Sequence, residues 1–300
     1  MDERKKGLAA MLIACVIWGF SPLFYHAMKG VGVGEVLAHR TIWSLVLFLV
    51  ILFIQRRPRA LTDALFGPYL GRIALAALLI SANWGIFIWA VQSGHVTESS
   101  LGYYVFPLIS VVLGVVVLGE KLTTAQSLAV ALAALAVIVL TLGLGVAPWI
   151  SLTLAGTMSI YGLVKKQLPL GPVVSVGAEV ALGTPIALLW LIAVHYAWVP
   201  TGPAHFGSDA MTTFLLIASG AVTAVPLILF SYASRRINLS TLGLLQYLNP
   251  TLQFFCAVVV FGEVFTIWHM IAFALIWTAL AIYTVSAMRH RIPARNDVPG

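Results

Sequence analysis

Long apolar runs separated by short polar links make up most of this sequence. A helix that crosses a bilayer needs about 20 mostly apolar residues. Ten runs approach that length, at 7–27, 35–54, 71–91, 99–118, 124–143, 147–164, 173–196, 211–233, 240–261 and 267–288. Among the links, only 197–210 is long and rich enough in Pro and Gly to be an obvious loop. The pattern predicts an all-α integral membrane protein with ten transmembrane helices.

The basic residues predict how these helices are oriented. Cytoplasmic loops of membrane proteins are enriched in Lys and Arg. If the N-terminus is cytoplasmic, every Lys and Arg except Lys29 and Arg40 falls at a cytoplasmic end of a run. A missed or additional span would scatter these residues over both sides. We therefore expect both termini to lie in the cytoplasm.

The composition excludes a water-soluble globular protein. Hydrophobic residues make up 61% of the chain and charged residues only 9%, against about 25% charged in soluble proteins. The mean hydropathy is +1.01. The net charge of +7 would suggest nucleic acid as a partner of a soluble chain. Here the charges mark orientation, so the expected partner is the lipid bilayer and no nucleic acid.

The sequence repeats itself at a fixed offset of 143 residues. This offset aligns Pro107 with Pro250, and Gly119-Glu120 with Gly262-Glu263. It also aligns Trp18-Gly19 with Tyr161-Gly162, Trp89-Ala90 with Tyr232-Ala233, and Tyr103-Tyr104 with Gln246-Tyr247. Each half holds five spans, an odd number, so the second copy crosses the membrane in the opposite sense. The expected organisation is a first repeat at 1–143, an inverted second repeat at 144–288 and a cytoplasmic tail at 289–300.

Inverted repeats are typical of carriers. Two similar halves of opposite orientation can exchange an outward-open shape for an inward-open one around a site near the midplane. The repeat therefore predicts transport by alternating access. The alternative is a duplication that serves folding only.

Polar and aromatic side chains at membrane depth indicate a candidate cavity. Amide groups that faced lipid would remain unsatisfied, and Trp18, Trp84 and Tyr103 lie too far from the span ends for an interfacial belt. An aromatic cavity with few charges suits small organic molecules. The candidate substrate-binding residues are Trp18, His39, Arg40, Asn83, Trp84, Tyr103, Tyr161, Gln246, Tyr247 and Asn249.

Two ionisable residues within the predicted spans have open roles. Arg40 either binds a carboxylate or phosphate of the substrate, or pairs with Glu35 or helix-end carbonyls. Glu179 is a candidate for carrying a coupling proton, or it is the partner of a nearby basic residue. No second acid accompanies Glu179 inside a span, so a dedicated proton relay has little support.

Prolines and glycines predict where the helices bend and end. Pro107 and Pro250 lie nearly half-way along equivalent spans and are candidate hinges, although kinked helices also occur for packing alone. Gly119-Glu120 and Gly262-Glu263 are expected to act as caps, with a Gly that stops one helix and an acid near the start of the next.

Motifs for other chemistry are missing from the sequence. It contains no GxxxxGK[ST], HExxH or GxSxG segment, and no His pair at metal-ligand spacing backed by a carboxylate. Cys15 and Cys256 lie inside apolar runs and are expected to be buried as small hydrophobic residues. We predict no cofactor, no metal and no enzymatic activity.

Several motifs resemble those of RarD-type members of the EamA family, within the drug/metabolite transporter superfamily. They are Trp18-Gly-Phe-Ser-Pro22, Glu35-Val-Leu-Ala-His-Arg40, Asn83-Trp84, Leu101-Gly-Tyr-Tyr104 with Pro107, Tyr161-Gly-Leu-Val-Lys165, Val222-Thr-Ala-Val-Pro226 and Leu239-Ser-Thr-Leu-Gly243. The resemblance covers nearly the whole chain. It implies a permease of the bacterial inner membrane, with ten helices in two inverted EamA repeats around a central cavity for amino acids or related metabolites.

The resemblance also bears on the cargo. Better-understood relatives export amino acids, including aromatic ones, so we expect export of neutral and aromatic amino acids and similar zwitterions by a monomer or homodimer. The single acid inside the spans favours facilitated diffusion. Alternatives are a proton-coupled drug or metabolite efflux permease, a non-transporting membrane component, and a passive channel.

Overall fold

The computed structural model describes residues 3–119, 123–145, 148–200, 203–234, 236–237 and 245–289, and within these ranges every regular element is helical. The helices are α1 (Glu3–Gly19), α2 (Ser21–His26), α3 (Val33–Ile54), α4 (Arg59–Leu65), α5 (Leu70–Gln92), α6 (Val96–Leu118), α7 (Thr124–Leu144), α8 (Trp149–Lys166), α9 (Pro172–His195), α10 (Ala210–Ser234), α12 (Leu248–Phe255) and α13 (Ile267–Arg289), with a π-helical turn η1 (Cys256–Val260) after α12. The predicted tail, apart from Arg289, and the predicted cap residue Glu120 lie outside the described residues.

Eight stretches of the described chain are long and apolar enough to cross a membrane. They are Glu3–His26, Val33–Ile54, Leu70–Gln92, Val96–Val117, Thr124–Leu144, Pro172–His195, Ala210–Phe230 and Ile267–Ser286. The predicted span 147–164 corresponds to α8, which ends in two lysines, and 240–261 corresponds in its described part to the shorter helical stretch Leu248–Val260. Helices of this length and composition make the chain a multi-pass membrane protein.

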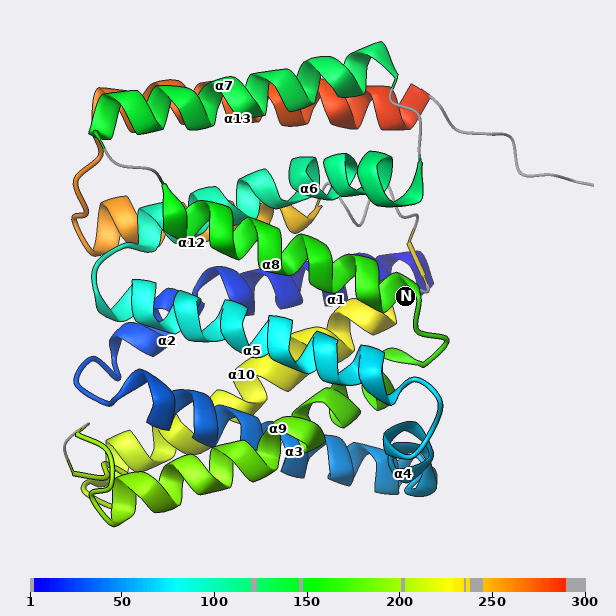
Figure 1. Ribbon diagram of the computed structural model, residues 1–300, viewed down its shortest axis with the longest axis vertical. Coiled ribbons are helices and arrows are strands. Elements are labelled where there is room, and N and C mark those ends of the chain that lie inside the picture. Colours follow the sequence, from blue (N-terminus) through cyan, green and yellow to red (C-terminus); the bar gives the residue numbers. More distant parts are fainter. Residues whose placement is uncertain are drawn as a thin grey trace, which may run out of the picture.

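Several of the helix contacts involve helices that the 143-residue offset relates. The pairs α7 with α13 and α3 with α9 pack directly on each other, at opposite ends of the long axis in Figure 1. In addition, α1 packs on α10 in the way that its equivalent, α8, packs on α5. α1, α5, α6, α8 and α12 lie between the two end pairs, whereas the short α4 lies at the α3–α9 end and packs on α9 (Figure 1).

A glycine allows the close approach of α3 and α10. A Cβ added to Gly220 would lie 2.5 Å from the carbonyl carbon of Trp43 and 2.7 Å from the backbone nitrogen of Ser44. Only a residue without a side chain permits this separation. The hydroxyl of Ser44 donates to the Gly220 carbonyl at 3.2 Å. This contact holds together the two helices that carry Arg40 and Thr223.

Glycines end two of the helices as expected, but the acid that follows one of them caps a different helix. Gly119 follows α6 with φ 68°, and Gly262 follows η1 with φ 65°. The carboxylate of Glu263 accepts hydrogen bonds from the backbone N–H groups of Val96 and Thr97, both at 2.7 Å. Glu263 thus satisfies free N–H groups at the start of α6, not of the helix that follows it in sequence.

The two candidate hinge prolines differ in their surroundings. Pro107 lies inside α6. Pro250 lies in the first turn of α12, which begins at Leu248, and at that position the helix has no internal partner for an N–H group. The irregularity follows instead at η1, five residues wound as a π-helix. Pro107 thus lies within a described helix and Pro250 near the start of one, and residues 240–244 of the span predicted around Pro250 lie outside the described residues.

Candidate functional site

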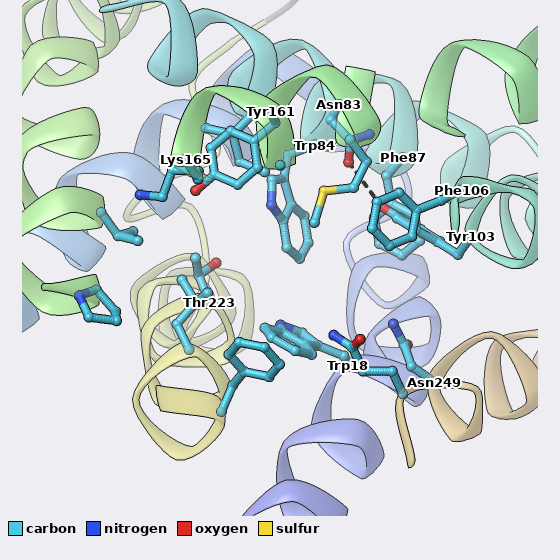
Figure 2. Close-up of a pocket in the computed structure, with 18 of the residues that line it drawn as sticks. Trp18, Asn83, Trp84, Phe87, Tyr103, Phe106, Tyr161, Lys165, Thr223 and Asn249 are labelled. Carbon is cyan, nitrogen blue, oxygen red and sulfur yellow. Dashed lines mark hydrogen bonds between the residues drawn. The ribbon is translucent and has the colours of Figure 1, made fainter. Parts of the chain in front are cut away.

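A cavity of ≈ 1250 Å³ lies among the central helices. Its lining residues come from both halves of the chain, and many are aromatic: Trp18, Trp84, Phe87, Tyr103, Phe106, Tyr161, Phe230, Tyr247 and Tyr283. Figure 2 shows Trp84 and Trp18 on opposite sides of an open space. Tyr103 and Phe106 border this space on one side, and Lys165 and Thr223 on the other (Figure 2).

The structure brings nearly all of the predicted site residues to this cavity. Those that line it are Trp18, Arg40, Asn83, Trp84, Tyr103, Tyr161, Gln246, Tyr247 and Asn249, together with Glu179, Pro107 and Pro250. His39 does not line it. Its ring stacks on Phe206 with centroids 4.6 Å apart, because consecutive helical residues point about 100° apart and His39 faces away from the side that Arg40 occupies.

Arg40 is a buried cation held by neutral groups. Its side chain is 7% exposed. Its Nε donates to the hydroxyl of Thr223 at 2.7 Å, and its guanidinium carbon lies 4.1 Å from the centroid of the Trp84 ring. Thr223 was not among the predicted site residues, although a polar residue midway along the 211–233 run was a signal that could have found it.

The expected alternative of a pair between Arg40 and Glu35 is not what the structure shows. Residues five apart in a helix lie about 140° apart around its axis, so the two side chains point in different directions. Among the described residues, no carboxylate lies within ion-pair distance of Arg40. The contacts of Arg40 are therefore compatible with a ligand acid, the other role that the sequence left open.

Glu35 instead closes one end of the bundle. Its carboxylate accepts the backbone N–H of His205 at 2.8 Å and that of Phe206 at 3.2 Å, and lies 3.0 Å from His205 Nδ1. The same connection ends at Asp209, whose Oδ1 accepts the N–H of Thr212 at 2.8 Å. This capping hydrogen bond holds the pKa of Asp209 below its ordinary value. The 203–209 connection is thus tied to α3 and to α10.

Glu179 has a basic partner, which answers one question that the sequence left open. Lys165 of α8 forms an ion pair with Glu179 and a hydrogen bond to Ser175. Glu179 also accepts hydrogen bonds from the Tyr161 hydroxyl at 2.9 Å and from the Ser175 hydroxyl at 3.2 Å. The sequence predicts only that Lys165 lies at a helix end, because it does not show that α8 and α9 place Lys165 against Glu179.

The amide side chains that line the cavity differ in how many of their hydrogen-bonding groups are already used. Asn83 donates to the carbonyl of Leu154 at 2.9 Å and accepts the Tyr103 hydroxyl at 3.0 Å, so it positions Tyr103 against α8. Gln253 donates to Asn249 at 3.0 Å. The buried Trp18 Nε1 and Gln253 Oε1 find no hydrogen-bond partner among the described residues. Both residues line the cavity, but these two atoms have almost no exposed surface and are not presented to it in this conformation.

Comparison with known proteins gives consistent matches. Residues 5–142 match the EamA-like transporter family. The chain is 44% identical to Protein RarD of Streptomyces exfoliatus over 96% of this chain and 91% of that protein. It is 38% identical to Protein RarD of Escherichia coli (strain K12), over 95% and 96%, and 35% identical to Uncharacterized transporter YojE of Bacillus subtilis (strain 168), over 98% of each chain.

A solved crystal structure shares the fold. That protein is 18% identical to this chain, and the two superpose with a TM-score of 0.62 over 96% of this chain and 100% of the other.

Proposed function

Since this chain belongs to the EamA-like transporter family, as a RarD-type member, we propose that it exports neutral and aromatic amino acids and related small metabolites. Membership makes it a membrane transporter. Its cargo and its direction of transport are proposed here from the cavity. We place it in the bacterial inner membrane and assign it no enzymatic activity.

The observation that carries the proposal is the cavity. Its volume of ≈ 1250 Å³ is large enough for a small organic molecule. The facing rings of Trp18 and Trp84 offer apolar walls for a side chain (Figure 2). The polar lining residues Arg40, Gln246 and Asn249 offer hydrogen-bonding groups for its polar end. These features match a cargo with an apolar body and a polar end.

The proposed architecture is ten spans in two inverted repeats, 1–143 and 144–288, with both termini in the cytoplasm. In support, helices that are equivalent under the 143-residue offset exchange packing partners, with α1 on α10 corresponding to α8 on α5. This arrangement suits a carrier in which the two repeats exchange conformations during alternating access.

The two ends of the cavity suggest which state is present. The lining residues Lys165, Leu170 and Pro172 lie where α8 ends and α9 begins, at the end of the bundle that we assign to the cytoplasm. At the other end, Glu263 holds the start of α6 and Glu35 holds the 203–209 connection. We therefore assign this conformation as inward-open. In the outward-open state these contacts would break, with Pro107 and Pro250 at the moving segments.

Facilitated diffusion is the proposed mode of coupling. A proton carrier must release and rebind a proton in each cycle. Glu179 is held by Lys165, Tyr161 and Ser175, so each protonation would leave the partly buried ammonium group of Lys165 without its partner. The export of amino acids would instead follow their concentration gradient.

Counterflow into liposomes that contain only the purified protein tests the proposal. Labelled neutral and aromatic amino acids are offered with and without an imposed pH gradient. We expect saturable counterflow that does not need the gradient. Counterflow that needs the gradient would support proton coupling. Uptake without counterflow would support a channel, and no uptake of any amino acid would contradict the proposed cargo.

A further inference from the structure

The charged residues of the cavity do not balance. Three of its lining residues carry a charge: Arg40, Lys165 and Glu179. Lys165 and Glu179 form an ion pair with each other. The positive charge of Arg40 therefore stays without an opposite charge among the described residues. A charge inside a membrane is costly unless a partner or water stabilises it, and this imbalance favours an anion in the cavity.

Arg40 is held in a fixed geometry that suits a carboxylate. Thr223 takes the Nε–H, one of the five N–H donors of a guanidinium group. The Thr223 hydroxyl donates in turn to the carbonyl of Ser219 at 3.2 Å, and the Trp84 ring covers one face of the guanidinium. The guanidinium group is already fixed at one edge and on one face. It therefore loses little entropy when two of its other N–H groups bind the two oxygens of a carboxylate.

The cavity offers no comparable site for an ammonium group. Glu179 is the one carboxylate among the described lining residues, and its side chain is only 1% exposed. Lys165 and Ser175 donate to its Oε1, and Tyr161 donates to its Oε2. A cationic group would have to displace Lys165 before it could pair with Glu179. A carboxylate at Arg40 would displace no charged group.

We infer that the cavity selects its cargo by net negative charge, and that the preferred cargo is an aromatic carboxylate without an ammonium group, bound through Arg40. The inference rests on the proposed function and narrows its cargo: among the proposed amino acids and related small metabolites, it assigns the related carboxylates as preferred and the amino acids as weaker cargo of the same cavity. The aromatic body lies between Trp18 and Trp84, and the carboxylate lies at the guanidinium group. The corresponding zwitterionic amino acid binds more weakly, because its ammonium group adds a second positive charge that no free carboxylate receives.

Three probes with the same phenyl body separate the two charges. They are 3-phenylpropionate, which carries only the carboxylate, phenylalanine, which carries both charges, and phenethylamine, which carries only the ammonium group. Their binding to the purified full-length protein in detergent is measured by calorimetry, and their competition for counterflow is measured in liposomes. We expect 3-phenylpropionate to bind about tenfold or more tightly than phenylalanine, and phenethylamine to bind most weakly.

Variants of Arg40 connect this preference to one side chain. In Arg40→Gln, 3-phenylpropionate should lose about tenfold or more in affinity, and phenethylamine should lose none. Arg40→Lys keeps the charge but loses the bidentate guanidinium geometry. Its affinity for 3-phenylpropionate should lie between those of the unaltered protein and Arg40→Gln. Arg72→Gln is the matched control, because Arg72 is an exposed arginine that contacts the carbonyl of Gln167 and does not line the cavity.

The outcomes separate this inference from the proposed function. Equal binding of the three probes to the unaltered protein, or tightest binding of phenylalanine, would overturn the charge selection even if neither Arg40 variant folds. Counterflow that is unchanged in Arg40→Gln would overturn the role of Arg40 and leave the carrier intact. Absence of counterflow with every probe would contradict the proposed function, and the calorimetry would still decide the charge selection.

Discussion

The guanidinium carbon of Arg40 lies 4.1 Å from the centroid of the Trp84 ring. The two residues come from α3 and α5, and both line the cavity. A cation over an indole ring is stabilised by about 0.5–2 kcal/mol, with the larger value for a desolvated pair. Trp84 therefore has two roles, since it orients the guanidinium group and forms part of the apolar wall opposite Trp18.

Removal of the Trp84 ring should weaken the binding of a carboxylate cargo. In Trp84→Leu the guanidinium loses its cation–π partner, worth about 0.5–2 kcal/mol, so affinity should fall about 2- to 30-fold. The affinity of Trp84→Phe should fall less, because a phenyl ring remains beside the guanidinium group. Calorimetry with 3-phenylpropionate measures the effect. Trp198→Leu is the control, because Trp198 is 70% exposed and does not line the cavity. Equal affinity in a folded Trp84→Leu protein would refute this role.

The ion pair between Lys165 and Glu179 should show strong coupling between its members. Lys165→Met alone leaves the carboxylate of Glu179, whose side chain is only 1% exposed, without its basic partner, which should lower the free energy of unfolding by about 3–5 kcal/mol. The double variant Lys165→Met with Glu179→Met removes both charges and should lose much less. Denaturant unfolding in detergent measures all the variants. A double variant as unstable as the single one would contradict this account.

The same variants also test the mode of coupling. If transport is facilitated diffusion, the double variant should still show counterflow without a pH gradient, because no proton has to pass through Glu179. Loss of all counterflow in a stable double variant would support a role for Glu179 in transport itself.

The contact of Glu263 with the start of α6 should hold one end of the cavity closed. Glu263→Ala removes the acceptor for the N–H groups of Val96 and Thr97, and each buried donor left unpaired costs about 1–3 kcal/mol in the closed state. Opening at this end should therefore become more frequent. A cysteine placed at Ser100, which is fully buried and donates to the Pro250 carbonyl, reports the opening by its rate of reaction with a membrane-impermeant maleimide.

The rate for Ser100→Cys should rise about fivefold or more when Glu263→Ala is added. Glu263→Gln keeps one acceptor oxygen and should have a smaller effect. Cys15 and Cys256 are both buried, and the protein without the introduced cysteine gives the background. An unchanged rate in Glu263→Ala would show that other contacts keep this end closed.

A methyl group at Gly220 should force α3 and α10 apart. The added Cβ would lie 2.5 Å from the carbonyl carbon of Trp43, so Gly220→Ala should destabilise the protein by about 1–3 kcal/mol. Arg40 and Thr223 lie on the same two helices, so carboxylate binding should fall as well. In Gly156→Ala the Cβ meets nothing within 4 Å, and the helix should gain about 0.5–1 kcal/mol. Thermal unfolding compares the two, and equal melting temperatures would contradict the packing argument.

Much of the cavity could be predicted because its residues violate the local rules of a lipid-exposed helix. Trp18, Trp84 and Tyr103 lie too deep for an interfacial belt, and they line the cavity. Asn249 is an amide at membrane depth, and it also lines the cavity. Such positions can be recognised within a single span. His39 could not be placed in this way, because it lies next to Arg40 in sequence and its direction depends on which neighbouring segment packs there.

The sequence by itself determined that the chain is an α-helical membrane protein and roughly where its helices run. It also determined which polar side chains are unsuited to lipid and which Trp and Tyr residues lie too deep for an interfacial belt. These properties depend on the hydropathy of each local segment. The tertiary structure decided the partners: Thr223 for Arg40, Lys165 for Glu179, and the start of α6 for Glu263. Two of these partners are more than 160 residues away in sequence. Which partner a side chain finds depends on how the helices pack and rotate against one another, and only the packing of the whole bundle sets that geometry.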